Sequence, residues 1–195
     1  MAGRPREFDR EVALRRIQAV FWARGFDGTS IADLVEATGL ASARLYAAFG
    51  SKEAAFRESV ELYEREEGGF ADRALAEEST VRGGLERMLR DAVEIYTRPQ
   101  PRGCMVVSAA GTCTSADEGV REWLQRRRRQ RTEAVVDRLE TAVASGELPT
   151  DADPRALGDA FAALLHGLSV QARDDVPRKR LLTLVAPAMT MLDHP

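Results

Sequence analysis

Apolar side chains recur at every third or fourth position along most of the chain, the spacing that places them on one face of an α-helix. Alternating β-branched stretches are nearly absent, and glycine and proline gather in a few short breaks. The pattern therefore predicts an all-α protein. We expect helices over residues 10–24, 31–37, 42–48, 52–67, 81–97, 104–113, 116–144, 154–172 and 177–192, with a looser stretch before residue 81 and a loop at 98–103.

The first three helices are short and predict a helix-turn-helix unit. Asp9 is placed to cap the first helix, and Gly25 to end it. Ser30 and Asp33 have the spacing of a capping box at the start of the second helix. Gly39 supplies the turn before the third helix. The apolar residues of all three helices would pack together and leave one face of the third helix pointing outward.

That outward face suits the major groove of DNA. Its side chains, small apart from one arginine, are Ser42, Ala43, Arg44, Ala47 and Ala48. Small side chains let a helix lie deep in the groove, where methyl groups can contact thymine and Arg44 can bind guanine. The alternative is a helical hairpin used only for packing.

Contacts to the DNA backbone are predicted beside this helix. Thr29 and Ser30 lie at a helix N-terminus, where free N–H groups attract phosphate. Tyr46 and Lys52 flank the third helix with a hydroxyl donor and a cation, both suited to phosphate oxygens. Such contacts would fix the register of the protein on DNA rather than read its sequence.

The stretch GFDGTSIADLVEATGLASARLYAAFGSKEAAF, residues 25–56, closely resembles the DNA-binding signature of the TetR family of bacterial repressors. The resemblance is carried by Gly-Phe, Thr-Ser-Ile, Gly-Leu, Leu-Tyr-x-x-Phe and Ser-Lys-Glu in that order. It implies a three-helix DNA-binding head over residues 1–50 and a larger helical effector-binding and dimerisation domain over residues 51–195. The positions that match DNA contacts in the family are Thr29, Ser42, Ala43, Arg44, Tyr46 and Lys52.

The resemblance also implies a homodimer that binds a palindromic operator and releases it when a small ligand enters the C-terminal domain. One residue departs from the family pattern. Ala41 stands where members commonly have a capping residue, so the third helix is capped weakly or starts at Ser42. The sequence therefore leaves two registers, one residue apart, for the side chains of the third helix that would face the bases.

Composition narrows the class of protein further. The chain has 28 Lys or Arg and 31 Asp or Glu, a formal charge of −3, which excludes a histone-like protein coated in positive charge. No apolar run approaches the ~18 residues of a membrane span, and the charged start lacks the apolar segment of an export signal. We expect a cytoplasmic protein with no membrane association.

Few residues are available for metal or catalytic chemistry. Two cysteines and two histidines exclude a zinc finger or a disulfide framework, so we expect no metal and no cofactor. An enzyme would need an acid, base or nucleophile set, yet His166 lies in an apolar helix and the carboxylates are scattered. We interpret His166 as structural and expect no catalysis.

The larger C-terminal part is expected to hold the effector. The residues that would surround a cavity are Met88, Tyr96, Met105, Val106 and Trp123. Because ligand sites are mostly apolar with few polar groups, a small apolar or aromatic effector is favoured. The alternative is that these residues are ordinary core.

Cys104 suggests a second way to respond to small molecules. Its setting, Pro-x-Gly-Cys-Met, resembles a segment of TetR-like regulators that include electrophile sensors with a reactive cysteine. A thiol in the first turn of a helix near Arg102 would have its thiolate favoured. A redox or electrophile sensor on the same DNA-binding scaffold is therefore an alternative, and a small buried residue is the other.

A dense run of arginines, residues 126–129 with Arg131, lies in the long helix over residues 116–144. Four consecutive residues point all round a helix, so they cannot form one flat DNA-binding stripe. We interpret the run as a helix section that meets solvent or pairs with acidic neighbours. An anion-binding role is the alternative.

The last two helices have the pattern of an association surface. Ala160, Ala163 and Gly167 permit close helix approach, and the family resemblance implies that these helices pair with their twins in a dimer. The apolar residues expected at that interface are Leu157, Phe161, Leu164, Leu168, Leu181 and Val185. The same stripe would equally suit a core within one chain.

Overall fold

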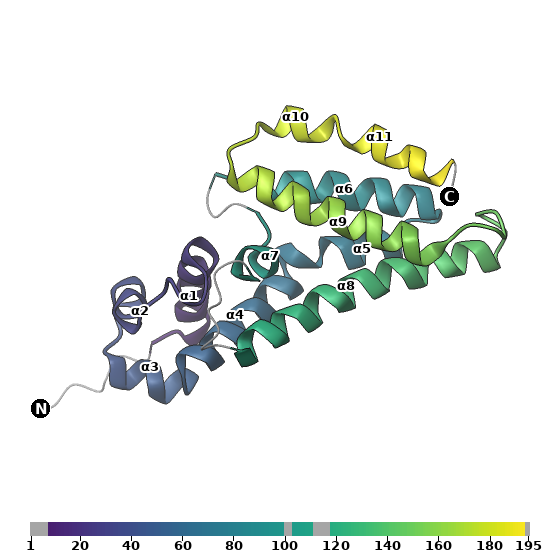
Figure 1. The fold of residues 1–195 in the computed structure, drawn as a ribbon. Coiled ribbons are helices and arrows are strands. Elements are labelled where there is room, and N and C mark those ends of the chain that lie inside the picture. The colour runs from purple at the N-terminus through teal and green to yellow at the C-terminus, as the bar shows by residue number, and fades with distance from the viewer. Residues whose placement is uncertain (1–7, 100–102, 111–117, 194–195) are drawn as a thin grey trace, which may run out of the picture.

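The computed structural model describes residues 8–99, 103–110 and 118–193, and every regular element in these ranges is helical. Three helices, α1 (Arg10–Arg24), α2 (Ile31–Thr38) and α3 (Ser42–Phe49), form a head at the N-terminal end of an elongated molecule (Figure 1). The remaining helices form the body, which extends away from the head. The predicted all-α fold is confirmed for the described part of the chain.

The head helices begin and end where local chemistry requires. Asp9 accepts hydrogen bonds from two amides in the first turn of α1, and Gly25 ends that helix with a positive φ. Ser30 and Asp33 form the reciprocal bonds of a capping box at the start of α2. Ala41 precedes α3 and makes no side-chain cap bond. The predicted bounds of these helices are confirmed to within a residue.

The body is built on longer helices. Its elements are α4 (Lys52–Arg65), the 3₁₀ turn η1 (Glu67–Gly69), α5 (Phe70–Glu77), α6 (Val81–Tyr96), α7 (Met105–Ala110), α8 (Glu118–Ala144), α9 (Pro154–Arg173), α10 (Arg178–Leu182), α11 (Val185–Met189) and η3 (Thr190–Leu192). Helices α6 and α9 lie side by side, α8 runs beneath them, and α10 and α11 cover them from above (Figure 1).

Two segments differ from the predicted pattern. The stretch expected to be loose contains the helix α5, whose Phe70, Ala71, Ala74 and Leu75 are buried against α6. The single helix predicted over residues 177–192 is broken at Thr183 and Leu184. Pro187 explains the break, because its ring clashes with the carbonyl four residues earlier and it has no amide to donate.

Two clusters of buried side chains form the core. The C-terminal cluster fills the space between α5, α6, α9 and the last helices, with Met88, Leu89 and Phe161 fully buried in it. The second cluster starts in the head with Ile17 and Phe21 and continues through α4, α7 and the start of α8. This second core therefore crosses the expected domain boundary at residue 50. None of the helices in the described ranges has the length and apolar character needed to cross a membrane.

Candidate functional site

The outward face of α3 carries the side chains that the sequence selected. Ser42, Ala43, Arg44, Tyr46 and Ala47 are exposed, whereas Leu45 packs into the head core. Ala48, which was expected to face outward, is half-buried against that core. Tyr46 is among the most exposed large hydrophobic residues in the described part of the chain, at 48%. The alternation arises because α3 is amphipathic and only its inner stripe is apolar.

Of the described cations in and beside the head, Arg16, Arg44 and Lys52 form no ion pair, and Arg16 donates instead to the carbonyl of Thr38. Arg10, Arg15 and Arg24 bind Glu58, Glu66 and Asp33, respectively. Within the described residues, Arg44 and Lys52 form no ion pair and lie instead over the rings of Phe8 and Phe26, at 5.8 Å and 4.3 Å.

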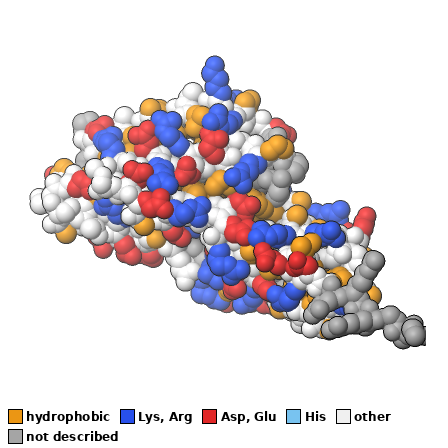
Figure 2. Space-filling model, turned by 180° about the vertical axis from the view of Figure 1, so that it is seen from behind, with side chains coloured by type: hydrophobic (Ala, Val, Ile, Leu, Met, Phe, Trp, Pro, Cys, Tyr) orange, Lys and Arg blue, Asp and Glu red, His pale blue; other side chains and the backbone are white. Residues whose placement is uncertain are grey.

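The positive charge that the head can offer to DNA is therefore concentrated beside α3. On the face in Figure 2, basic and acidic side chains are interspersed over the molecule. That mixture is consistent with a small reading surface rather than a broad basic one.

The N-terminus of α2 needs a correction. Thr29 is buried, and its hydroxyl donates to the carbonyl of Gly25 at 2.8 Å, so this side chain does not face a DNA backbone. The Ser30 hydroxyl is held in the capping box with Asp33. Hydrogen bonds from Ser30, followed by the charge of Arg24, lower the pKa of Asp33, so an anionic side chain already occupies this helix end.

A cavity lies where the body meets the head. It encloses about 510 Å³ of atom-free space, part of which opens to solvent. Its wall is formed by Tyr63, Glu64, Gly68, Tyr96, Cys104, Val106, Val107, Arg127, Arg128, Arg131, Val135, Ala162, Leu165 and His166. Helices α4, α6, α7, α8 and α9 all contribute, so the cavity exists only when the body is assembled.

Polar groups gather on one part of this wall. The thiol of Cys104 interacts with the hydroxyls of Tyr63 and Tyr96. Burial, followed by the neighbouring Cys104, raises the pKa of both tyrosines well above the ordinary value, so both hydroxyls stay protonated at neutral pH. The Tyr63 hydroxyl has no hydrogen-bond partner among the described residues.

Three arginines of α8 reach the same wall. Arg127 lies 3.5 Å from Glu61 and 3.4 Å from Glu64, and its guanidinium stacks over Trp123. Arg128 lies 3.5 Å from the carbonyl oxygen of Val106. The arginine run thus pairs with acidic neighbours in part, as predicted, but it also faces a cavity.

Arg131 is held at the cavity by contacts on two sides. Its guanidinium donates to the carbonyl of Gly68 at 3.1 Å and lies 3.5 Å from Asp72. Burial lowers the pKa of Arg131 and Asp72 raises it, with a net rise, so the side chain stays charged. Burial and then the charge of Arg128 lower the pKa of His166, which favours the neutral imidazole.

Only part of the predicted pocket lines this cavity. Tyr96 and Val106 do, whereas Met88 is fully buried in the C-terminal core and Met105 in the core shared with the head. Trp123 is also outside the lining and packs its ring against Phe56. The apolar character that selected these three residues belongs to ordinary core packing.

Sequence reasoning missed several residues of the wall. Tyr63 follows Phe56 and Val60 on the buried stripe of α4, which marks it as inward but gives no sign of a cavity. His166 was expected to be structural, and Arg131 was assigned to solvent or ion pairs. Their convergence depends on how α4, α8 and α9 pack, which the pattern of one helix does not encode.

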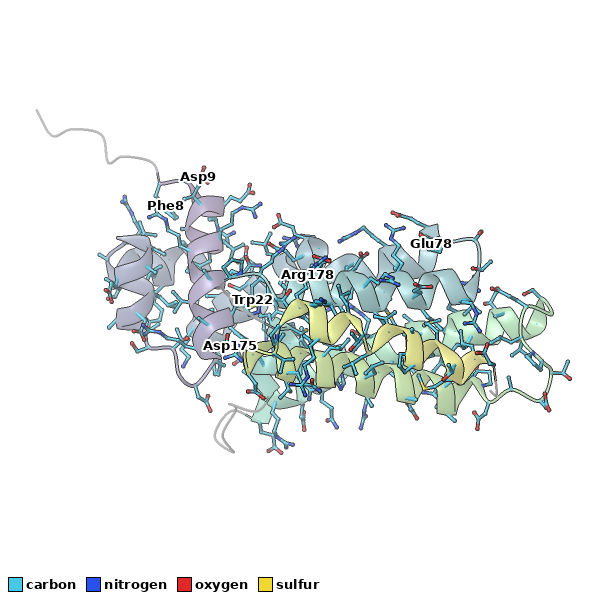
Figure 3. The ribbon with its side chains drawn as sticks, turned by 90° about the horizontal axis from the view of Figure 1, so that it is seen from above. Phe8, Asp9, Trp22, Glu78, Asp175 and Arg178 are labelled. Atoms are coloured by element: carbon cyan, nitrogen blue, oxygen red, sulfur yellow. The ribbon has the colours of Figure 1, made fainter. Side chains whose placement is uncertain are left out.

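Trp22 connects the head to the cavity. Its indole N–H donates to the carbonyl of Gly103 at 3.1 Å, and its ring meets that of Tyr63 edge-on at 4.7 Å. Figure 3 places Trp22 at the junction of the head and the body. Arg173 of α9 also donates to the carbonyls of Trp22 and Ala23.

Gly103 occupies a junction that excludes a side chain. Its φ is +74°, and a Cβ there would lie 2.8 Å from the carbonyl oxygen of Ser169. Its amide donates to the carbonyl of Tyr96 at 2.9 Å, and the next amide, that of Cys104, donates to the Ser169 hydroxyl at 2.8 Å. The backbone of Gly103 and the amide of Cys104 therefore join α1, α6 and α9 at the cavity edge.

The residues expected at a dimer interface also need a correction. Leu157, Phe161, Leu168, Leu181 and Val185 are all buried within the single chain. They fill the space between α9, α6 and the last helices, because the strongest apolar stripe of each helix faces its own core.

The opposite face of α9 stays uncovered. Ala156 and Ala163 are exposed on it, Leu164 is half-buried, and Val170 is 52% exposed. A Cβ on Gly167 would meet nothing within 4 Å.

Comparisons with known proteins agree with this architecture. Residues 14–58 match the family described as bacterial regulatory proteins, tetR family, and residues 82–183 match the tetracyclin repressor-like C-terminal domain. The HTH-type transcriptional repressor ComR of Escherichia coli (strain K12) is 28% identical over 191 residues, covering 97% of this chain and 91% of that protein.

Two solved structures are also similar. One is a cysteine-substituted variant of the TetR family transcriptional regulator CifR in complex with 26-base-pair operator DNA. It is 43% identical, covers 95% of this chain and 98% of its own, and has a TM-score of 0.91. The other is a TetR transcriptional regulator from Rhodococcus sp. RHA1, 34% identical over 93% of this chain and 98% of its own, with a TM-score of 0.64.

Proposed function

This chain belongs to the TetR family of transcriptional regulators, and from that premise we propose that it represses transcription by binding a palindromic operator as a homodimer and leaves the operator when a small effector enters its cavity. The observation that carries the proposal is the direct contact between the cavity wall and the head at Trp22. Family members bind DNA rather than catalyse a reaction, and we propose the same for this chain, acting in the cytoplasm.

The proposed DNA contacts lie on and beside α3. Arg44 reads a base edge in the major groove, where Ser42 and Ala43 allow close approach. Tyr46 and Lys52 bind phosphates on either side. Ser30 contributes at the end of α2, and Thr29 acts by anchoring the turn through Gly25 rather than by touching DNA.

A double variant tests these phosphate contacts. DNA selected from a random pool by the wild-type protein supplies the operator. Tyr46→Phe with Lys52→Ala should keep the fold, lose operator affinity and lower the slope of log affinity against log salt by about 1. Lys179→Ala, which removes an exposed lysine of α10, is the matched control. Unchanged binding by the double variant would refute the assignment.

Release of DNA is proposed to pass through Trp22. An effector that moves the Tyr63 ring or the Gly103 backbone would change the position of α1, because Trp22 of α1 packs against that ring and donates a hydrogen bond to the Gly103 carbonyl. Each operator half-site lies about 34–36 Å from the other, so a small tilt of each head breaks the match to successive major grooves. Effector and DNA must then weaken each other's binding reciprocally.

The homodimer is proposed to form through the uncovered face of α9. Small side chains at Ala156, Ala160, Ala163 and Gly167 let a second α9 approach closely, and Leu164 adds apolar surface. Light scattering after size exclusion should give a dimer for the wild type and a monomer for Ala163→Arg. Ala144→Arg, at the exposed end of α8, is the control. A wild-type monomer would contradict the repressor mechanism.

A second candidate function is sensing of electrophiles or oxidants by Cys104. The observation in its favour is that the thiol lines the cavity beside two tyrosine hydroxyls. Arg102, which was expected to favour the thiolate, and Cys113 lie outside the described residues. Maleimide labelling of a Cys113→Ser protein, followed by an operator-binding assay, tests the idea. It fails if Cys104→Ser responds identically to electrophiles.

A further inference from the structure

The Tyr63 hydroxyl is buried, and the Cys104 thiol is its polar neighbour. No oxygen or nitrogen of a described residue accepts a hydrogen bond from it, and its own oxygen is shielded from solvent. Its ring is fixed, because Trp22 packs against one side and Gly68 lies so close that a Cβ there would be 2.4 Å from Tyr63 Cε1. The ring is therefore held in one place, and Tyr63 is among the residues that line the cavity.

Further donors converge on the same wall. Tyr96 contributes a second protonated hydroxyl, and Arg131 contributes a guanidinium on a partly buried side chain, 22% exposed. Arg131 uses some of its N–H groups on the Gly68 carbonyl and on Asp72, whose side chain is 63% exposed. Five N–H groups in a planar fork leave capacity for a further acceptor.

The charge of the wall is positive. Arg127, Arg128 and Arg131 line it, whereas Glu64 is the acidic side chain lining it among the described residues. Glu64 is 3.4 Å from Arg127, which compensates it, and burial raises its pKa. His166 stays neutral and adds no negative charge. Asp72 and Glu61 lie beside Arg131 and Arg127 without lining the cavity, so the lining itself carries more cationic than anionic side chains.

We propose that the effector is a small carboxylic acid, with its carboxylate on the Tyr63 and Tyr96 hydroxyls and the Arg131 guanidinium, and its apolar body against Val106, Val135 and Leu165. A carboxylate has about four acceptor sites and no donor, so it complements a wall that holds donors. Its bonds to charged or strongly polar donors are the strong ones. The proposal rests on the proposed function, because it names the effector class for the same cavity.

The size and lining of the cavity limit the part of the effector that lies beyond its carboxylate. The 510 Å³ includes space open to solvent, so the enclosed part is much smaller and fits at most one ring or a short alkyl chain. Beyond the polar groups the wall is apolar, with valine, alanine and leucine from α7, α8 and α9. A phosphate ester would bring a second negative charge. Among the described lining residues we assign no further cation to bind that charge.

The test compares acids with their neutral amides. Benzoate, phenylacetate and octanoate are each titrated by calorimetry against the DNA-free protein beside benzamide, phenylacetamide and octanamide. At least one acid should bind, and its amide should bind at least tenfold more weakly. Tyr63→Phe should weaken that acid about tenfold and leave the amide unchanged, because it removes one donor and no protein contact beyond the weak interaction with the Cys104 thiol. Tyr46→Phe, a hydroxyl on the DNA-reading surface, should change neither.

Each outcome decides the proposal. Equal affinity for acid and amide, no binding by any of the three acids, or unchanged acid affinity in Tyr63→Phe would overturn it. Cys104→Ser should retain acid binding, and loss of acid binding in this variant would overturn the assignment of the carboxylate to the two tyrosine hydroxyls and Arg131. Operator binding by the ligand-free protein is measured separately. Absence of operator binding would refute the proposed function. Release of the operator by a neutral or electrophilic compound, and not by an acid, would refute only the proposal that the effector is a carboxylic acid.

Discussion

Replacing Tyr63 by phenylalanine should make the ligand-free protein more stable, which is the opposite of what most core substitutions do. The hydroxyl is shielded from solvent and has no hydrogen-bond partner among the described residues. The ring itself is fully packed, with 1% of the residue exposed. Tyr63→Phe removes the hydroxyl and keeps the ring contact with Trp22, so the loss that offsets the gain is the weak interaction with the Cys104 thiol.

The size of the effect follows from the cost of a buried unsatisfied group. Such a group costs about 1–3 kcal/mol in the folded state. Because local relaxation recovers some of that cost already, we expect a gain of about 1 kcal/mol. For a chain of 195 residues this corresponds to a rise in Tm of about 2–4 °C. The effect is small but lies well above the error of a thermal scan.

Calorimetric scans at one fixed protein concentration measure this shift, since dimer formation makes Tm depend on concentration. Tyr46→Phe is the matched control, because its hydroxyl is exposed and its loss should change stability by less than about 0.5 kcal/mol. A Tm of Tyr63→Phe equal to or below that of the wild type would refute the reasoning. It would mean that the hydroxyl already has an acceptor, and the carboxylate site would lose its main support.

Three further predictions concern the junction and the cavity wall. Trp22→Phe leaves the Gly103 carbonyl without its donor, so unfolding should cost about 1–3 kcal/mol less in denaturant titration and effector-driven release of DNA should weaken. Gly103→Ala forces a Cβ into a position with φ +74° and 2.8 Å from the Ser169 carbonyl, and should lower Tm by more than an alanine at the exposed Gly119 does. The folded protein lowers the pKa of His166, so the unfolded chain binds the proton at a higher pH than the folded chain does. Tm should therefore fall as the pH drops below about 6.5 and level off below the folded pKa. The fall in Tm should be smaller in His166→Gln, which has no imidazole to protonate.

The head could be predicted from the sequence because its elements are set by local chemistry. Asp9, Ser30 and Asp33 act within three residues of the amides that they cap, and Gly25 and Gly39 end helices by their own backbone conformation. Each of these signals lies inside a short window of sequence. The bounds of α1, α2 and α3 followed from them, and so did the identity of the exposed residues on α3.

The cavity could not be predicted in the same way. Its walls come from five helices, and a side chain joins the lining only if its neighbours leave space beside it. Met88 and Tyr96 lie on the same buried face of α6, yet Met88 is enclosed by core and Tyr96 meets the cavity. The pattern of α6 marks both as buried and gives no way to separate them.

The association surface was misplaced for a related reason. Helix α9 has two apolar stripes, and the larger side chains, Leu157 and Phe161 among them, face the body. The smaller stripe of alanine and glycine stays uncovered, and it is the surface that we propose for the dimer. Hydrophobic strength alone selected the first stripe, whereas the packing of α6 and α10 against α9 decides which stripe remains free.

The core that supports the head also determines when the head can finish folding as the chain is made on the ribosome. That core takes in Met105 and Val106 of α7 and Trp123 and Leu124 of α8, far along the chain from α1. A nascent chain therefore cannot complete its head when the first three helices leave the ribosome, and must wait until the start of α8 has emerged. By then Tyr63, Tyr96 and Cys104 have been made. A fragment that ends before α7 would lack the Trp123 ring that packs on Phe56, so we expect its head to be less stable than the head of the whole chain.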